Sequence, residues 1–143
     1  MRLTLTTIVP LLLSVTGVNA GCYSSGEQWG WTFGYGTARQ HVKNACHGYW
    51  EGNQFKNGAL QDTWFKSNSE SSLPATVCIN AVTQKVGGYH MILQVTNLQN
   101  NGRTLSQTDC ENGLMSEIDS CAAGGQSDKW GWRFRSDPQL GWC

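Results

Sequence analysis

The sequence predicts an α+β fold: a disulfide-bonded, single-domain sandwich of an antiparallel sheet with two helices. Two segments carry apolar residues at helical spacing, and others alternate apolar and polar residues as strands do. Six cysteines are spread along the 143 residues. Helices separated by antiparallel strand pairs are typical of an α+β layer fold, and the length suits one domain of about 100–150 residues.

The first 20 residues are predicted to be a secretory signal peptide. Met1 and Arg2 give a positive start, residues 3–15 are largely apolar, and residues 18–20 supply the small side chains of a cleavage site. The apolar stretch falls short of the roughly 20 residues that span a bilayer. We therefore expect a secreted, extracellular protein of residues 21–143. Loss of Arg2 would leave its net charge at −1.

Charge and composition exclude several classes of protein. The chain holds 10 Lys and Arg against 10 Asp and Glu, and 14% of its residues are charged. A nucleic-acid binder that neutralises phosphates needs a basic surface, and so does a protein held on acidic membranes. We expect neither nucleic acid nor membrane insertion. The hydrophobic content of 39% also argues against a disordered chain.

An even number of cysteines in a secreted chain predicts three disulfides. The pairing stays open among about 15 connectivities. No two cysteines have the short spacing of a zinc site, so neither a metal nor another cofactor is expected. Oxidation would also remove any cysteine nucleophile. The six residues are Cys22, Cys46, Cys78, Cys110, Cys121 and Cys143.

The first helix is expected directly after an irregular or extended segment, residues 21–36. Thr37 can cap it, and apolar residues recur at three- and four-residue spacing between Ala38 and Cys46. Gly48 is a natural stop. Residues 49–66 then predict one or two short strands with loops, and residues 67–74 predict a polar loop.

The clearest strand signal lies in residues 75–96. Residues 75–86 are rich in strand-forming side chains, and apolar side chains alternate strictly along residues 89–96. Gly87 and Gly88 stand between the two runs, as in a two-residue turn that needs positive φ at both positions. The pattern predicts an antiparallel hairpin.

A second helix and a last strand complete the expected order. Ser106 and Asp109 have the form of a capping box. Apolar residues and cysteines from Cys110 to Cys121 then fall on one helical face, and Gly124 and Gly125 end the helix. Residues 129–135 alternate aromatic side chains with glycine and arginine, which predicts a strand.

Two aromatic segments resemble each other. Trp29-Gly30-Trp31-Thr32-Phe33 near the start matches Trp130-Gly131-Trp132-Arg133-Phe134 near the end. In extended chains the three rings of each segment would share one face, and the segments could pair as strands. These rings either fill the core or leave some indoles exposed as a binding platform, because exposed apolar patches mark binding surfaces.

A catalytic set is hard to find. There is no Gly-x-Ser-x-Gly elbow. A ribonuclease would need two acid/base groups and a cation. His41, His90, Glu51 and Arg133 supply these residue types, but no sequence motif joins them into a site. Glycosidase action would need two suitably spaced carboxylates, and the acids are scattered along the chain. We expect no catalysis.

Several motifs together resemble a known family. They are Gly21-Cys22-Tyr23-Ser24-Ser25-Gly26-Glu27 followed by Trp29, the pair Cys110 and Cys121 followed by Gly-Gly, and a final Trp-x-Phe-x-x-Asp-Pro with a closing Gly-x-Cys. Their order is similar to that of the small secreted fungal glycan-binding proteins of the Y3-like family. The resemblance implies a disulfide-bonded sandwich of helices and strands that binds glycans as a lectin.

The sequence therefore predicts a secreted, lectin-like protein that recognises soluble or cell-surface glycans. Trp31, Tyr35 and Trp132 are expected to stack on sugar rings. Asn101, Arg133 and Asp137 are expected to bond hydroxyl groups. A small secreted hydrolase of the ribonuclease kind, or a cysteine-rich effector or toxin acting on a host protein, remain alternatives.

Overall fold

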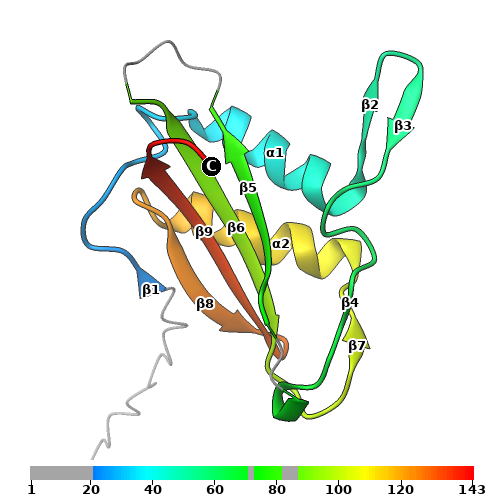
Figure 1. The fold of residues 1–143 in the computed structure, drawn as a ribbon. Coiled ribbons are helices and arrows are strands. Elements are labelled where there is room, and N and C mark those ends of the chain that lie inside the picture. The colour runs from blue at the N-terminus through cyan, green and yellow to red at the C-terminus, as the bar shows by residue number, and fades with distance from the viewer. Residues whose placement is uncertain (1–20, 71–72, 82–86) are drawn as a thin grey trace, which may run out of the picture.

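The fold is that of a computed structural model, which describes residues 21–70, 73–81 and 87–143. The predicted signal peptide, residues 1–20, lies outside the described residues. Two α-helices lie together on one face of a five-stranded antiparallel sheet, and among the described residues no helix lies on the other face (Figure 1). The prediction of a disulfide-bonded α+β sandwich is confirmed.

The strand order of the sheet is β1-β8-β9-β6-β5, so β9 and β6 form its centre. The helices are α1 (Tyr35–His47) and α2 (Gln107–Ser120). The sheet strands are β1 (Gly21–Cys22), β5 (Ala75–Asn80), β6 (Tyr89–Asn97), β8 (Gly125–Lys129) and β9 (Trp132–Leu140).

The core lies between the sheet and the helices. Alternate residues of β6 are buried, including Met91, Leu93 and Val95, and their neighbours in sequence are half-exposed on the other face. Helix α2 contributes buried Leu114 and Ile118 to this core. The strict alternation read from the sequence thus marks the face of the sheet that packs on the helices.

Helix α1 begins three residues earlier than predicted. Gly34 is its N-cap with φ 72°, and Thr37 lies inside the first turn. Glycine adopts this left-handed conformation without strain, which sets the start of the helix. Its end is confirmed, because Gly48 has φ 82° and donates its N–H to the carbonyl of Asn44.

Helix α2 follows its sequence signal closely. The Ser106 hydroxyl accepts the backbone N–H of Asp109 at 3.0 Å, which satisfies a donor that the helix leaves free. The predicted apolar face is confirmed, with Cys110, Leu114 and Ile118 buried. The prediction that Gly124 and Gly125 end the helix is wrong: the helix ends at Ser120, because Cys121 already has an extended backbone, and Gly125 opens strand β8.

The pairing of β5 with β6 is confirmed, but the predicted two-residue turn is wrong. Asn80 lies opposite His90, so the connection spans residues 81–88. Residues 82–86, which the prediction placed in the first strand, lie outside the described residues. Gly87 and Gly88 do have positive φ, at 100° and 62°.

Residues 49–66 contain three short strands where one or two were expected. β2 (Tyr49–Glu51) and β3 (Gln54–Lys56) form a hairpin that projects from the body of the molecule, and β4 (Trp64–Phe65) pairs with β7 (Arg103–Thr104) (Figure 1). A short 3-10 turn, η1 (Asn68–Glu70), follows.

All six cysteines are paired, as predicted. The disulfides join Cys22 to Cys121, Cys46 to Cys110 and Cys78 to Cys143. They tie β1 to the end of α2, α1 to α2, and β5 to the last residue. Within the described ranges, neither helix has the length and apolar character that crossing a bilayer requires.

Candidate functional site

The two Trp-Gly-Trp segments do not pair as strands, so this prediction is wrong. Residues 29–33 form a turn before α1. Two hydrogen bonds hold it: the N–H of Trp29 donates to the carbonyl of Ala122, and the N–H of Gly34 donates to the carbonyl of Trp29. Trp29 is 0% exposed, whereas Trp31 is 52% exposed. One indole of this segment fills the core and the other faces solvent.

The second segment is broken by a tight turn. Trp130 and Gly131 have φ 53° and 77°, and Lys129 on β8 lies opposite Trp132 on β9. The two residues therefore form the turn between these strands, and residues 129–135 are not one strand. Here the first indole, Trp130, is 56% exposed and the second, Trp132, is 0% exposed.

The burial of Trp132 overturns its predicted role in ligand stacking. Its ring packs edge-on against Phe65 at a centroid distance of 5.2 Å, and the Arg103 guanidinium lies 4.2 Å from its centroid. A ligand cannot reach a fully buried ring. Trp132 is a core residue that joins β9 to β4.

The predicted polar residues do not form one site. Arg133 is exposed near the β8–β9 turn, where it donates to both carboxylate oxygens of Asp128 at 2.8 and 2.9 Å. Asn101 lies at that same end, because its carbonyl accepts the amide of Asn97, the partner of Trp132. Asp137 lies several residues further along β9.

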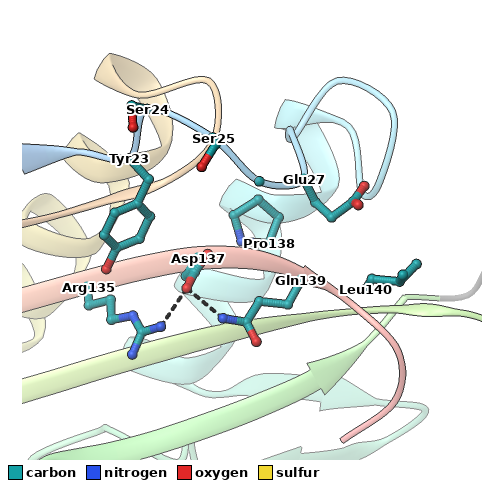
Figure 2. Close-up of a pocket in the computed structure, with 10 residues that line it drawn as sticks. Tyr23, Ser24, Ser25, Glu27, Arg135, Asp137, Pro138, Gln139 and Leu140 are labelled. Carbon is teal, nitrogen blue, oxygen red and sulfur yellow. Dashed lines mark hydrogen bonds and ion pairs between the residues drawn. The ribbon is translucent and has the colours of Figure 1, made fainter.

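The structure instead has a depression on the face of the sheet opposite the helices. It has a volume of about 570 Å³ and lies between the loop after β1 and the second half of β9. Figure 2 shows the Tyr23 ring pointing toward Arg135, and Arg135 and Gln139 pointing toward Asp137. The lining residues with side chains are Tyr23, Ser24, Ser25, Glu27, Arg135, Asp137, Pro138, Gln139 and Leu140.

The alternation of β9 places the polar residues in this depression. Phe134 and Ser136 face the helices, since the Ser136 hydroxyl donates to the carbonyl of Leu114. The residues between and after them, Arg135, Asp137 and Gln139, therefore face the other way.

Asp137 is the centre of a hydrogen-bond network. Its Oδ2 accepts Arg135 Nη2 at 2.5 Å and Gln139 Nε2 at 2.8 Å (Figure 2). Arg135 Nη1 also donates to Gln94 Oε1 at 3.0 Å. Among the described residues, no hydrogen bond falls on Oδ1 of Asp137. Asp137, a residue only 7% exposed, is thus held through Oδ2, while Oδ1 has no hydrogen-bond partner among the described residues.

Tyr23 forms the opposite wall. Its ring lies over Arg135, with the guanidinium carbon 5.9 Å from the ring centroid. Burial raises the pKa of Tyr23 above its ordinary value of 10.0. Burial opposes the charge of Arg135, but the hydrogen bond to Asp137 and the nearby Tyr23 raise its pKa overall. The depression thus combines an aromatic ring with a fixed cation and a carboxylate.

Trp31 adjoins the depression through Glu27. Its indole Nε1 donates to Glu27 Oε2 at 3.0 Å, and Glu27 is one of the lining residues. Tyr35 opens α1 and does not line the depression. Of the six predicted ligand residues, Asp137 lines the depression, Trp31 adjoins it only through Glu27, and the other four lie elsewhere.

The residues combined as a ribonuclease set are dispersed. His41 on α1 packs edge-on against Phe33 at 5.8 Å, and burial lowers its pKa. His90 lies on β6 and contacts the carbonyl of Gly141, while Glu51 lies on the projecting hairpin. In the part of the chain that the structure describes, no cluster of His, Cys, Asp or Glu could hold a metal.

Comparison with protein-family models, curated proteins and solved structures gives no match for this chain. The likeness to Y3-like proteins therefore stays a prediction from sequence motifs.

Proposed function

We propose that the protein is a lectin that binds glycans in the depression between Tyr23 and Asp137. The observation that carries this proposal is the buried Asp137, fixed by Arg135 and Gln139 with one carboxylate oxygen free. A fixed acceptor on an open surface suits a ligand that offers hydroxyl groups, because an ionised carboxylate forms strong hydrogen bonds with such donors.

The composition of the site supports a sugar over other small molecules. The C–H face of a sugar ring packs on aromatic rings, which Tyr23 supplies within the depression and Trp31 supplies beside it. Hydroxyl groups need both acceptors and donors, and Asp137, Gln139 and Ser25 offer these. The volume of about 570 Å³ lies within the usual range for ligand pockets.

The proposal includes secretion. Three disulfides persist in oxidising compartments and are rare in the cytosol. The signal-like residues 1–20 and the motif likeness to secreted fungal glycan-binding proteins point the same way.

A glycan array probed with the oxidised protein tests the proposal. Gln139→Ala removes a donor to Asp137 and part of the wall, so we expect about tenfold weaker binding to the preferred glycan. Gln126→Ala is the matched control, because Gln126 is exposed on β8 and does not line the depression. Equal binding by the wild type and Gln139→Ala, or no glycan bound at all, would contradict the proposal.

Hydrolysis is a second candidate, favoured by one observation. Two carboxylates, Glu27 and Asp137, line the same depression, and glycosidases use a pair of such groups. We expect binding without turnover, because Glu27 accepts the Trp31 indole and Asp137 accepts two donors. Incubating the protein with the bound glycan and analysing the products tests this, and cleavage that Asp137→Asn abolishes would establish the enzyme.

A further inference from the structure

Strand β5 forms one edge of the five-stranded sheet. The direction of its backbone groups follows from one hydrogen bond: the N–H of Ala81 donates to the carbonyl of Tyr89 on the β6 side. Backbone groups alternate along a strand, so Ala75, Val77 and Ile79 also face β6. The N–H and C=O groups of Thr76, Cys78 and Asn80 therefore point away from the sheet, and within the described chain none has a backbone partner.

This edge lacks the usual protection against further pairing. Natural edge strands carry charges or proline, or are very short. β5 has six residues, Ala-Thr-Val-Cys-Ile-Asn, with no charge and no proline. The opposite edge, β1, has only two residues and offers little to pair with.

A hollow follows the same edge on the helix side. It has a volume of about 430 Å³ and is lined by Val77 and Ile79 of β5, by His41 of α1, and by Tyr49 and Ala59. A second hollow of about 300 Å³ adjoins Ala75 and is walled by exposed Trp64 and Leu73. Ala75, Val77 and Ile79 pack against the core on one side and, on the side away from β6, line these two hollows.

We propose that β5 binds an extended peptide segment of a partner protein, which adds to the sheet as a sixth strand. The free N–H and C=O groups of Thr76, Cys78 and Asn80 would bond the peptide backbone. Its alternate side chains would enter the two hollows, as in other cases of strand addition. The segment would be about six residues long, apolar at every second position and uncharged there.

Shape favours such a segment over a second copy of this chain. A second copy would bring an edge with the same hollows, and two hollow surfaces leave the space between them unfilled. The side chains of a single extended peptide would instead fill the hollows of one edge. This site is independent of the proposed glycan site, which lies along β9 on the other face of the sheet.

Selection from a displayed library of random, cysteine-free 12-residue peptides tests the proposal, with the oxidised wild type as bait. We expect the enriched peptides to carry apolar residues at every second position. Synthetic copies should protect the amides of Thr76, Cys78 and Asn80 from hydrogen exchange. Thr76→Pro removes one N–H at the free edge and no bond to β6, so we expect about tenfold weaker binding.

Thr76→Val is the matched control, because it also loses the Gln94 bond to the Thr76 hydroxyl but keeps the backbone N–H. Its affinity should stay within about twofold of the wild type. If Thr76→Pro fails to fold, Ala59→Trp provides the test of peptide binding. An indole at this exposed position would fill the larger hollow and abolish binding.

Three results would overturn the proposal. They are a selection that enriches no peptide, peptides that bind Thr76→Pro and Ala59→Trp as tightly as the wild type, and binding that leaves the three amides unprotected. Analytical ultracentrifugation of the wild type tests whether a second copy of the chain occupies the edge instead. A dimer that Thr76→Pro dissociates would assign the edge to a second copy.

Discussion

The two Trp-Gly-Trp-x-Phe segments differ in structure although they match in sequence. In the first, Trp29 is buried and Trp31 is exposed; in the second, Trp130 is exposed and Trp132 is buried. Each segment places its two indoles in opposite environments, and the order is reversed. Residues two apart share a face only in an extended strand, and in both segments a turn intervenes.

The position of each indole relative to the turn decides whether the indole is buried or exposed. The turn at residues 29–33 buries Trp29, whose ring contacts the Phe33 ring at a centroid distance of 6.4 Å. The turn at Trp130 and Gly131 instead exposes the residue in the turn and buries the first residue of β9. Buried indoles stabilise the fold, which leaves Trp31 and Trp130 for other roles.

The largest expected effect is on stability. Trp29→Ala and Trp132→Ala should each lower the free energy of unfolding by about 3–5 kcal/mol, because each leaves a cavity in the core. Trp31→Ala and Trp130→Ala should change it by about 0.5 kcal/mol or less, since both rings are exposed. Urea unfolding of the four variants measures this. Similar losses in all four would refute the division into core and surface indoles.

The central glycines should differ as well. Gly131→Ala should cost about 1–2 kcal/mol, because Gly131 has φ 77° and a Cβ there would lie 2.5 Å from Gln99 Nε2. Gly30→Ala should change stability by about 0.5 kcal/mol or less, since its nearest contact is 4.0 Å away, at Tyr35. Thermal unfolding of the two variants compares them, and equal shifts would show that the segments share one backbone conformation.

A smaller expected effect is on the pH dependence of stability, which should differ between the groups that contact the two segments. His41, against Phe33, has a pKa lowered by burial below 6.5, so its neutral form stabilises the folded state. This contribution is present above pH 6.5 and is lost as pH falls through the lowered pKa. Asp128, bonded to Arg133, has a pKa lowered below 3.8 by that bond, so its contribution is lost only in stronger acid.

Thermal melts between pH 7.5 and 3 measure this difference. The His41→Gln variant should lack the loss of stability below pH 6.5, and Asp128→Asn should lack the one below pH 3.8. If His41→Gln shows the same loss as the wild type near pH 6, another group causes it.

Local signals in the sequence predicted much of the fold. The alternation of β6, the helical face of α2 and the Ser106 cap are set by neighbours in sequence, and all three are present. Strand β8, with the sequence Gly-Gln-Ser-Asp-Lys, was not predicted, because it has no apolar alternation and is ordered by pairing with β9. The turn at Trp130 escaped prediction because positive φ is unusual for a tryptophan.

The candidate site was predicted less well, for a related reason. Asp137 and Trp31 were predicted, but Tyr23, Arg135 and Gln139 were not. The depression forms because the β1–β8 pairing and the Cys22–Cys121 disulfide bring the loop after β1 beside β9. These segments are more than 100 residues apart in sequence, and no local pattern joins them.

The matched indoles also test the proposed function most directly. Trp31 is bonded to Glu27 at the depression, whereas Trp130 lies in the turn before β9 and bonds Arg103 through its carbonyl. Both rings are about half exposed, so their alanine variants remove the same side chain at similar exposure in two different places. The measurement is the dissociation constant of Trp31→Ala and Trp130→Ala for the glycan that the wild type prefers. We predict about tenfold weaker binding for Trp31→Ala and unchanged binding for Trp130→Ala; equal constants for the two variants would contradict the account.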